Sequence, residues 1–168
     1  MARIFFIHNE HDKASRDLLD ELQVAHPEVE VVDFMDVREF VRIQGTPSVI
    51  LLPTSAPGIS GFVCWQKDIN PTLADIEDAL TKARVLSLTS DKAQVLAGEQ
   101  FTLTVTAVDL DGNPASIPAD TIIGVSGFES IPDAQGRVTV TSNAAGVAEC
   151  VAYSDFARSG YCEVVVDG

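Results

Sequence analysis

The sequence of 168 residues contains few basic residues, only three cysteines and no long apolar run. Lysine and arginine number 11 against 25 aspartate and glutamate residues, so the net charge is −14. Nucleic acids and anionic membrane surfaces are bound by basic surfaces, and we expect neither as a partner. No stretch approaches the roughly 20 apolar residues of a membrane span, and the first apolar run is too short for a signal-peptide core. We therefore expect synthesis and folding in the cytoplasm.

Hydrophobic residues make up 46% of the chain, as in ordinary globular proteins, but their pattern changes near residue 85. Residues 1–84 alternate helical and strand patterns, with 8 basic and 14 acidic side chains. Residues 85–168 contain short alternating strands separated by glycine and small polar residues, with 3 basic and 11 acidic side chains. The sequence therefore predicts two acidic domains, 1–84 and 85–168. Their acidity indicates either simple solubility or a basic partner surface.

Periodicity in the first half predicts the element order βαβαββα. The expected strands are residues 4–7, 29–34, 48–52 and 62–65. Two amphipathic helices carry the apolar stripes Ala14, Leu18, Leu19, Leu22, Ala25 and Leu73, Ile76, Ala79, Leu80, Ala83. Asn9 or Asp12 is expected to cap the first of these, and Asn70 the last. Between them, a short helix is expected to open at Asp36 and to end at Gly45.

A proline stands directly before the third expected strand, in the stretch Gly45-Thr46-Pro47-Ser48-Val49-Ile50-Leu51-Leu52. With this stretch and the closing hairpin plus helix, residues 2–84 resemble the thioredoxin/glutaredoxin superfamily. The resemblance implies an α/β thioredoxin-like fold in which this proline is cis and faces the active site. Pro47 is therefore the candidate cis-proline.

The catalytic motif that the resemblance implies is missing. In that family a CxxC motif lies between the first strand and the first helix, where the helix N-terminus lowers the thiol pKa. Here residues 8–15 contain no cysteine, and Ser15 cannot replace one because its hydroxyl does not ionise near pH 7. We expect no enzymatic activity, no catalytic residue and no cofactor. The opposing hypothesis, a redox enzyme with an unusual site, predicts dithiol-dependent reduction of insulin.

The same segment contains two histidines. His8 and His11, with Glu10 and Asp12 close by, are metal ligands by residue type. Polar side chains that face solvent at a strand-to-helix turn explain them better, so we predict no metal site. Cys64 is predicted to be a small buried apolar residue.

About seven short strands in the second half predict an all-β sandwich. Four turn segments accompany them: Ala97-Gly98, Asp109-Leu110-Asp111-Gly112-Asn113-Pro114, Asp133-Ala134-Gln135-Gly136-Arg137-Val138 and Asn143-Ala144-Ala145-Gly146. On these segments residues 85–168 resemble the bacterial Ig-like domains of invasin-type adhesins and of phage structural proteins. The resemblance implies an Ig-like sandwich that binds proteins or glycans or acts as a spacer, and not an enzyme.

Oxygen-bearing side chains gather after the long strand of this half. Asp109, Asp111, Asn113 and Asp120 have the residue types of calcium ligands. Their spacing does not match the calcium-loop pattern, because the glycine comes too early and the closing residue is aspartate. We therefore predict a hairpin turn here.

Cys150 and Cys162 are expected on the last two strands, joined by residues 154–159. Pairing about residue 156 places them nearly opposite each other, at the ~5 Å Cβ separation of cross-strand neighbours. Two states are open: a disulfide formed at an extracellular stage, or two buried thiols kept reduced in the cytoplasm.

Together these expectations favour a structural protein of a bacteriophage virion, folded in the host cytoplasm and later exposed outside the cell. The thioredoxin-like half would dock on capsid, neck or tail subunits and on its own copies. The Ig-like half would project outward, with weak contact to a cell surface. Head decoration, a neck or collar position and a tail accessory role are all open. The alternative is a bacterial protein- or peptide-binding module that uses the groove beside Pro47.

Overall fold

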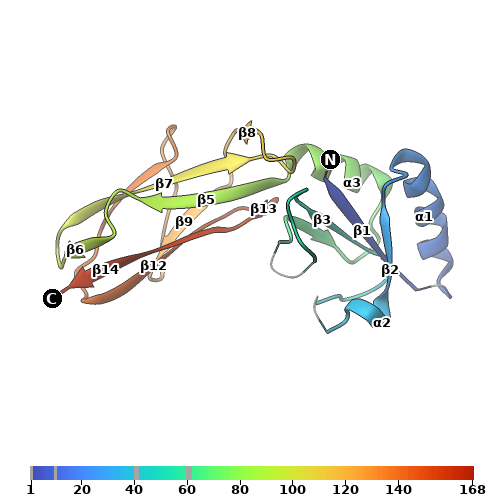
Figure 1. Cartoon of the computed structure of the whole chain (residues 1–168), viewed down its shortest axis with the longest axis horizontal. Helices are drawn as coiled ribbons and strands as arrows, with labels where there is room; N and C mark the ends of the chain where they lie inside the picture. Colours follow the sequence, from blue (N-terminus) through green and yellow to red (C-terminus); the bar gives the residue numbers. More distant parts are fainter. Residues whose placement is uncertain (1, 10, 40–41, 60–61) are drawn as a thin grey trace. The chain divides into compact units, whose positions relative to one another are not determined.

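The computed structural model describes residues 2–9, 11–39, 42–59 and 62–168, which divide into two compact units (Figure 1). The first unit comprises Met1–Ala83 and Asp109–Asn113, and the second comprises Arg84–Val108 and Pro114–Gly168. The first contains helices and strands, and the second contains strands. A mixed α/β first half and a β-rich second half are what the sequence predicts.

A four-stranded mixed sheet forms the centre of the first unit, in the order β2-β1-β3-β4. Its strands are β1 (Arg3–His8), β2 (Glu30–Asp33), β3 (Ser48–Leu52) and β4 (Trp65–Lys67). β1 pairs in parallel with β2 and antiparallel with β3, and β4 lies antiparallel to β3 at the edge. The two central strands are long buried runs, because both faces of the sheet are covered.

Three helices belong to this unit among the described residues: α1 (Lys13–Ala25), α2 (Phe34–Val37) and α3 (Leu73–Lys82). The order β1-α1-β2-α2-β3-β4-α3 is the predicted βαβαββα. α1 buries Leu18 and Leu22, but Ala14 and Ala25, which were expected on the same stripe, are exposed. Ser15 is buried instead, and its hydroxyl is satisfied by donating a hydrogen bond to the Asp12 carboxylate, the cap of the helix.

The second helix lies earlier in the chain than predicted. β2 ends at Asp33, whose carboxylate accepts a hydrogen bond from the Met35 N–H at 2.7 Å and caps α2. The prediction that the helix opens at Asp36 and ends at Gly45 is therefore wrong, since α2 ends at Val37. Residues 40–41, which were expected inside this helix, lie outside the described residues.

The strand predicted at residues 62–65 lies later than expected, since β4 begins only at Trp65. Phe62 and Val63 pack against the buried cluster of Phe5, Ile7, Val37, Ile50, Leu52 and Ala56. Their apolar character thus reflects packing against the core and not membership of the sheet.

Thr72, and not Asn70, caps the third helix. Thr72 Oγ1 accepts a hydrogen bond from the Asp75 N–H at 3.2 Å, and the Asp75 carboxylate accepts one from the Thr72 N–H at 2.9 Å. Asn70 has a φ of 45°, whereas an N-cap residue is extended. Lys67 on β4 pairs with Asp75 at 2.8 Å, and this contact together with the Thr72 hydrogen bonds lowers the pKa of Asp75 to about 2. The charged carboxylate ties α3 to the edge strand.

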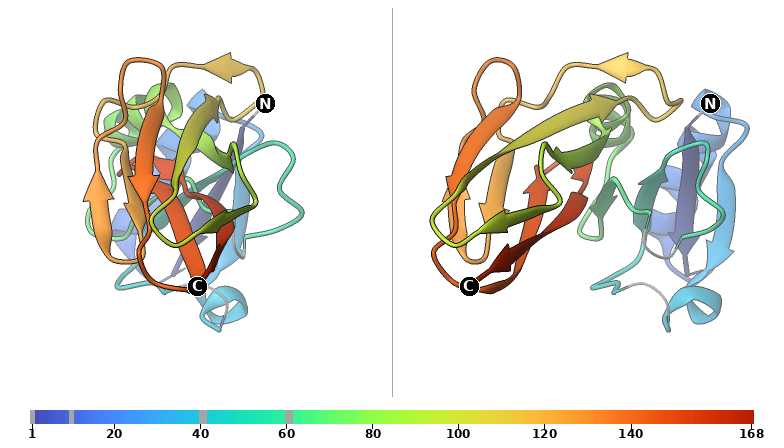
Figure 2. Two further views of the ribbon diagram at one scale, coloured as in Figure 1. Left: turned by 90° about the vertical axis from the view of Figure 1, so that its left-hand side faces the viewer. Right: turned by 60° about the vertical axis from the view of Figure 1, so that its left-hand side comes forward.

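Two five-stranded mixed sheets make up the second unit (Figure 2). One has the order β10-β9-β12-β14-β6, and the other has the order β11-β7-β5-β13 with β8 beside β7. The strands are β5 (Arg84–Ser90), β6 (Gln94–Leu96), β7 (Gln100–Val108), β8 (Pro114–Ala115), β9 (Ile122–Val125), β10 (Phe128–Ser130), β11 (Arg137–Thr141), β12 (Gly146–Tyr153), β13 (Ala157–Arg158) and β14 (Gly160–Asp167).

One hydrophobic core lies between these two sheets. Among its most deeply buried members, each at most 1% exposed, are Phe101 and Leu103 on β7, Ile123 on β9, Cys150 on β12 and Val164 on β14. β7 alternates buried and more exposed residues along its length, as the sequence predicts for a strand with one face on the core.

The second unit has more strands among the described residues than the seven that the sequence predicts. β8, β10 and β13 contain only two or three residues each, too few to show an alternating pattern. β6 leaves the sheet of its neighbours β5 and β7 and pairs in parallel with β14, some seventy residues later in the sequence.

Candidate functional site

The end of the first sheet brings together the residues that the thioredoxin-like resemblance singles out. β1 ends at His8, which lies opposite Asp33 of β2, and Ile7 lies opposite Ser48 at the start of β3. The Thr46–Pro47 peptide bond, directly before β3, is cis. Pro47 itself is buried and does not present a surface to a partner.

The polar side chains at this end of the sheet serve the local fold. Asp12 caps α1 by accepting hydrogen bonds from the Ala14 N–H at 3.1 Å and the Ser15 hydroxyl at 2.9 Å. The Asn9 side chain accepts a hydrogen bond from the His11 N–H at 3.1 Å. The His8 ring stacks on Phe6 at a centroid distance of 6.5 Å. Among the described residues, no group of three His, Cys, Asp or Glu side chains could hold a metal ion, and Glu10 lies outside them.

A hollow of about 430 Å³ lies next to the edge strand β4, and its lining includes Arg42, Gln44, Gln66 and Ile69. Asp68 organises it, because its carboxylate accepts hydrogen bonds from the Gln44 N–H at 3.0 Å and the Gln66 side-chain amide at 2.7 Å. Ile69 is 64% exposed at its rim. Pro47 is not among the lining residues, so this hollow is not the groove expected beside Pro47, which stays a prediction.

All three cysteines are free thiols. Cys64 is 3% exposed, and its Sγ donates to the Phe62 carbonyl oxygen at 3.7 Å. Cys150 and Cys162 lie directly opposite each other on β12 and β14, as the pairing about residue 156 predicts, and both are free thiols. Burial raises the pKa of the Cys150 thiol to about 12 and also raises the pKa of Cys162. Both thiols stay protonated near neutral pH and are weak nucleophiles.

The acidic segment after β7 forms a turn. The Asp109 carboxylate accepts hydrogen bonds from the backbone N–H groups of Asp111 and Asn113, both at 2.9 Å. The hydrogen bonds from Asn113 lower the pKa of Asp109. Asp120 serves a different loop, where it accepts hydrogen bonds from the Ser154 hydroxyl and the Asp155 N–H. These four side chains do not converge on one point, in agreement with the predicted turn.

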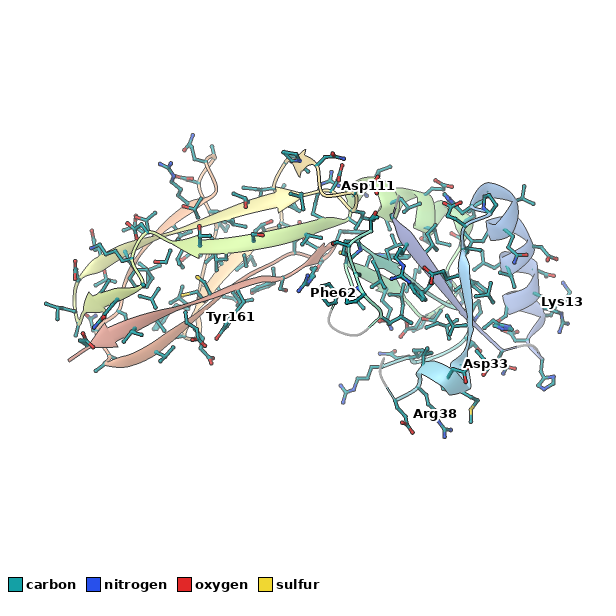
Figure 3. The ribbon with its side chains drawn as sticks, viewed as in Figure 1. Lys13, Asp33, Arg38, Phe62, Asp111 and Tyr161 are labelled. Atoms are coloured by element: carbon teal, nitrogen blue, oxygen red, sulfur yellow. The ribbon has the colours of Figure 1, made fainter. Side chains whose placement is uncertain are left out.

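A surface that the sequence analysis did not identify lies on the outer face of the sheet containing β12. Its members, which we call the tyrosine–glutamate face, are Glu129, Glu149, Val151, Tyr153, Tyr161 and Glu163. Because side chains alternate along a strand, they point away from the core into which Ala148, Cys150 and Val164 point. Tyr161 is 55% exposed (Figure 3).

Gly124 on β9 leaves a hollow of about 290 Å³ in the tyrosine–glutamate face. Tyr153 and Tyr161 flank it, with Glu129 and Glu149 at its margin. The sequence signal for this site is that the tyrosines and glutamates of β12 and β14 all lie at odd-numbered positions. Once the register of the two strands is known, this spacing places them on one face of the sheet.

None of the helices in the described residues has the length and apolar character needed to cross a lipid bilayer. No protein-family model matches this sequence, and a search of curated proteins finds no significant match.

Proposed function

We propose that this chain is a non-enzymatic structural protein of a bacteriophage virion. Its thioredoxin-like first unit docks on capsid, neck or tail subunits, and its Ig-like second unit projects from the particle. The observation that carries the proposal is the pair of five-stranded sheets around one core. Residues 109–114 and 133–138 add the resemblance to phage Ig-like domains.

The chemistry of the first unit supports a structural role. Its element order is that of the thioredoxin-like resemblance, but the segment between β1 and α1 contains no cysteine. The capping roles of Asp12 and Asp33 account for two of the carboxylates at this end of the sheet. Such a fold would present a binding surface to other subunits and would have no reactive centre.

Purified particles test this proposal. We expect quantitative mass spectrometry of gradient-purified virions to detect the chain at a fixed number of copies per particle across independent preparations. Abundant cytoplasmic host proteins serve as the control, because carry-over falls with each purification step while a structural component does not. Absence of the chain from particles, or an amount that falls together with the host proteins, would contradict the virion role.

The second candidate function is a protein- or peptide-binding module, which the hollow at the edge strand β4 favours. An extended peptide could add to this edge and place a side chain against Ile69. In a peptide-library screen on the full chain, Ile69→Asp is expected to weaken selected binders about tenfold. Val24→Asp, on the exposed face of α1 at 87% exposure, is the matched control and should leave them unchanged. Binders that are insensitive to Ile69→Asp would exclude this site.

A further inference from the structure

We propose that the tyrosine–glutamate face binds a basic polypeptide segment, with one arginine or lysine side chain inserted into the hollow beside Gly124. The aliphatic part of that side chain would lie against Val151, and its cationic end would reach Glu129 and Glu149. The inference concerns the second unit alone and does not rest on the virion role.

The first argument is a repulsion between two carboxylates. Glu149 on β12 and Glu163 on β14 lie directly opposite each other in the strand register, and both are exposed. Like charges that face each other across neighbouring strands are destabilising. Among the described residues, the five strands of this sheet contain no lysine and no arginine. A cation from a partner would therefore supply the charge that this face lacks.

The second argument is the arrangement of the tyrosines. The Tyr153 hydroxyl donates a hydrogen bond to Glu129 at 2.5 Å, and the Tyr161 hydroxyl donates one to Glu163 at 2.7 Å. These hydrogen bonds to carboxylates raise the pKa of Tyr153 and raise that of Tyr161 to about 12, so both phenols stay neutral. Because the phenol protons are already donated to the carboxylates, a partner can contact only the tyrosine ring faces and the remaining carboxylate lone pairs. Both attract a cation more strongly than they attract a neutral glycan.

The third argument is the size and lining of the hollow. Its volume of about 290 Å³ is at the lower limit of small-ligand sites and suits one side chain. The hollow exists because Gly124 has no side chain where its neighbours on β9 and β12 have one. Phe128, which is 81% exposed at the margin, adds apolar surface for the aliphatic part of a long basic side chain.

The proposal is tested with the full chain and a fluorescein-labelled peptide of four arginine-serine repeats, followed by fluorescence anisotropy. We expect saturable binding that weakens about tenfold or more when salt rises from about 50 to 500 mM, because exposed charges are screened. The lysine-serine peptide should bind and the glutamate-serine peptide should not. No binding of the arginine peptide, or competition by a neutral oligosaccharide, would overturn the proposal.

Charge variants locate the site. The double variant Glu149→Gln/Glu163→Gln is expected to weaken binding about tenfold or more. Asp20→Asn/Glu21→Gln on α1 changes the net charge by the same amount and is the matched control, since both residues are exposed in the first unit. Equal losses in the two double variants would show a general attraction to an acidic protein and would overturn the assignment of the site.

A variant of unchanged charge tests the hollow itself. A Cβ at Gly124 would meet its nearest neighbours, Val151 Cγ1 and the Phe128 carbonyl oxygen, at 3.5 and 3.8 Å, which are ordinary contacts. The side chain of Gly124→Val would occupy the hollow, and the urea transition of the variant shows whether it folds. We expect about tenfold weaker binding of the arginine peptide. Unchanged affinity in a folded Gly124→Val protein would contradict insertion of a side chain.

Discussion

Phe101→Ala is expected to lower the free energy of unfolding of the second unit by about 3–5 kcal/mol. Phe101 lies on β7, is 1% exposed and belongs to the core shared by both sheets. Removal of the ring forfeits its transfer free energy and leaves a cavity that strands on two sides cannot close. The loss is a large part of the roughly 5–15 kcal/mol that stabilises a typical domain.

Urea unfolding of the full chain measures this loss with separate signals for the two units. The single tryptophan, Trp65, lies in the first unit, and both tyrosines, Tyr153 and Tyr161, lie in the second. The tyrosine transition should move to lower urea. Leu96→Ala, at 61% exposure in the same unit, should change the free energy of unfolding by no more than about 0.5 kcal/mol. A loss below about 1 kcal/mol for Phe101→Ala would contradict the shared core.

Gly136→Ala is expected to cost about 2–5 kcal/mol, because backbone strain adds to a steric clash. Gly136 has a φ of +76°, and a Cβ there would lie 2.5 Å from the Val105 carbonyl oxygen and 2.6 Å from Ile117 Cδ1. The glycine cannot move away freely, since its carbonyl accepts a hydrogen bond from the Val105 N–H at 2.8 Å. The turn before β11 thus requires a residue without a side chain.

Gly98→Ala separates the cost of backbone strain from the cost of the steric clash. Gly98 has a similar φ of +86°, but its nearest neighbour to a Cβ, Asn143 Oδ1, would be 3.8 Å away. This variant should show only the backbone cost of about 1–2 kcal/mol in the same urea experiment. Equal losses for Gly136→Ala and Gly98→Ala would mean that the close approach to β7 has no energetic consequence.

Element order in the first unit was predictable because apolar periodicity reports burial directly. Helix boundaries were less predictable, since several residues near the start of each helix have side chains that can act as caps. Asn70 is a good cap by type, but its left-handed backbone leaves that role to Thr72. Phe62 and Val63 are apolar because they pack on the core, which sequence alone does not distinguish from strand pairing.

In the second unit, the pairing of β12 with β14 was predictable from the turn centre, and it places Cys150 opposite Cys162. The same register places Glu149 opposite Glu163 and Val151 opposite Tyr161, yet the tyrosine–glutamate face was not anticipated. Its hollow depends on the neighbouring strand β9, which brings Gly124 beside Val151. The local sequence does not indicate which distant strand becomes a neighbour in the sheet. Periodicity alone therefore cannot predict a site that two such strands form together.

The parallel pairing of β6 with β14 has a consequence for synthesis on the ribosome. β6 emerges some seventy residues before the strand against which it is hydrogen-bonded. During that interval β6, with Val95, lacks the strand with which it pairs. β12 also lacks β14, its neighbour in the sheet, until the end of synthesis. Contacts between segments so far apart slow folding, because the chain loses loop entropy before the contacts form. The sheet of the first unit is complete once Lys67 has been synthesised, whereas both partners of β12 and β6 are present in the second unit only after β14 has been synthesised.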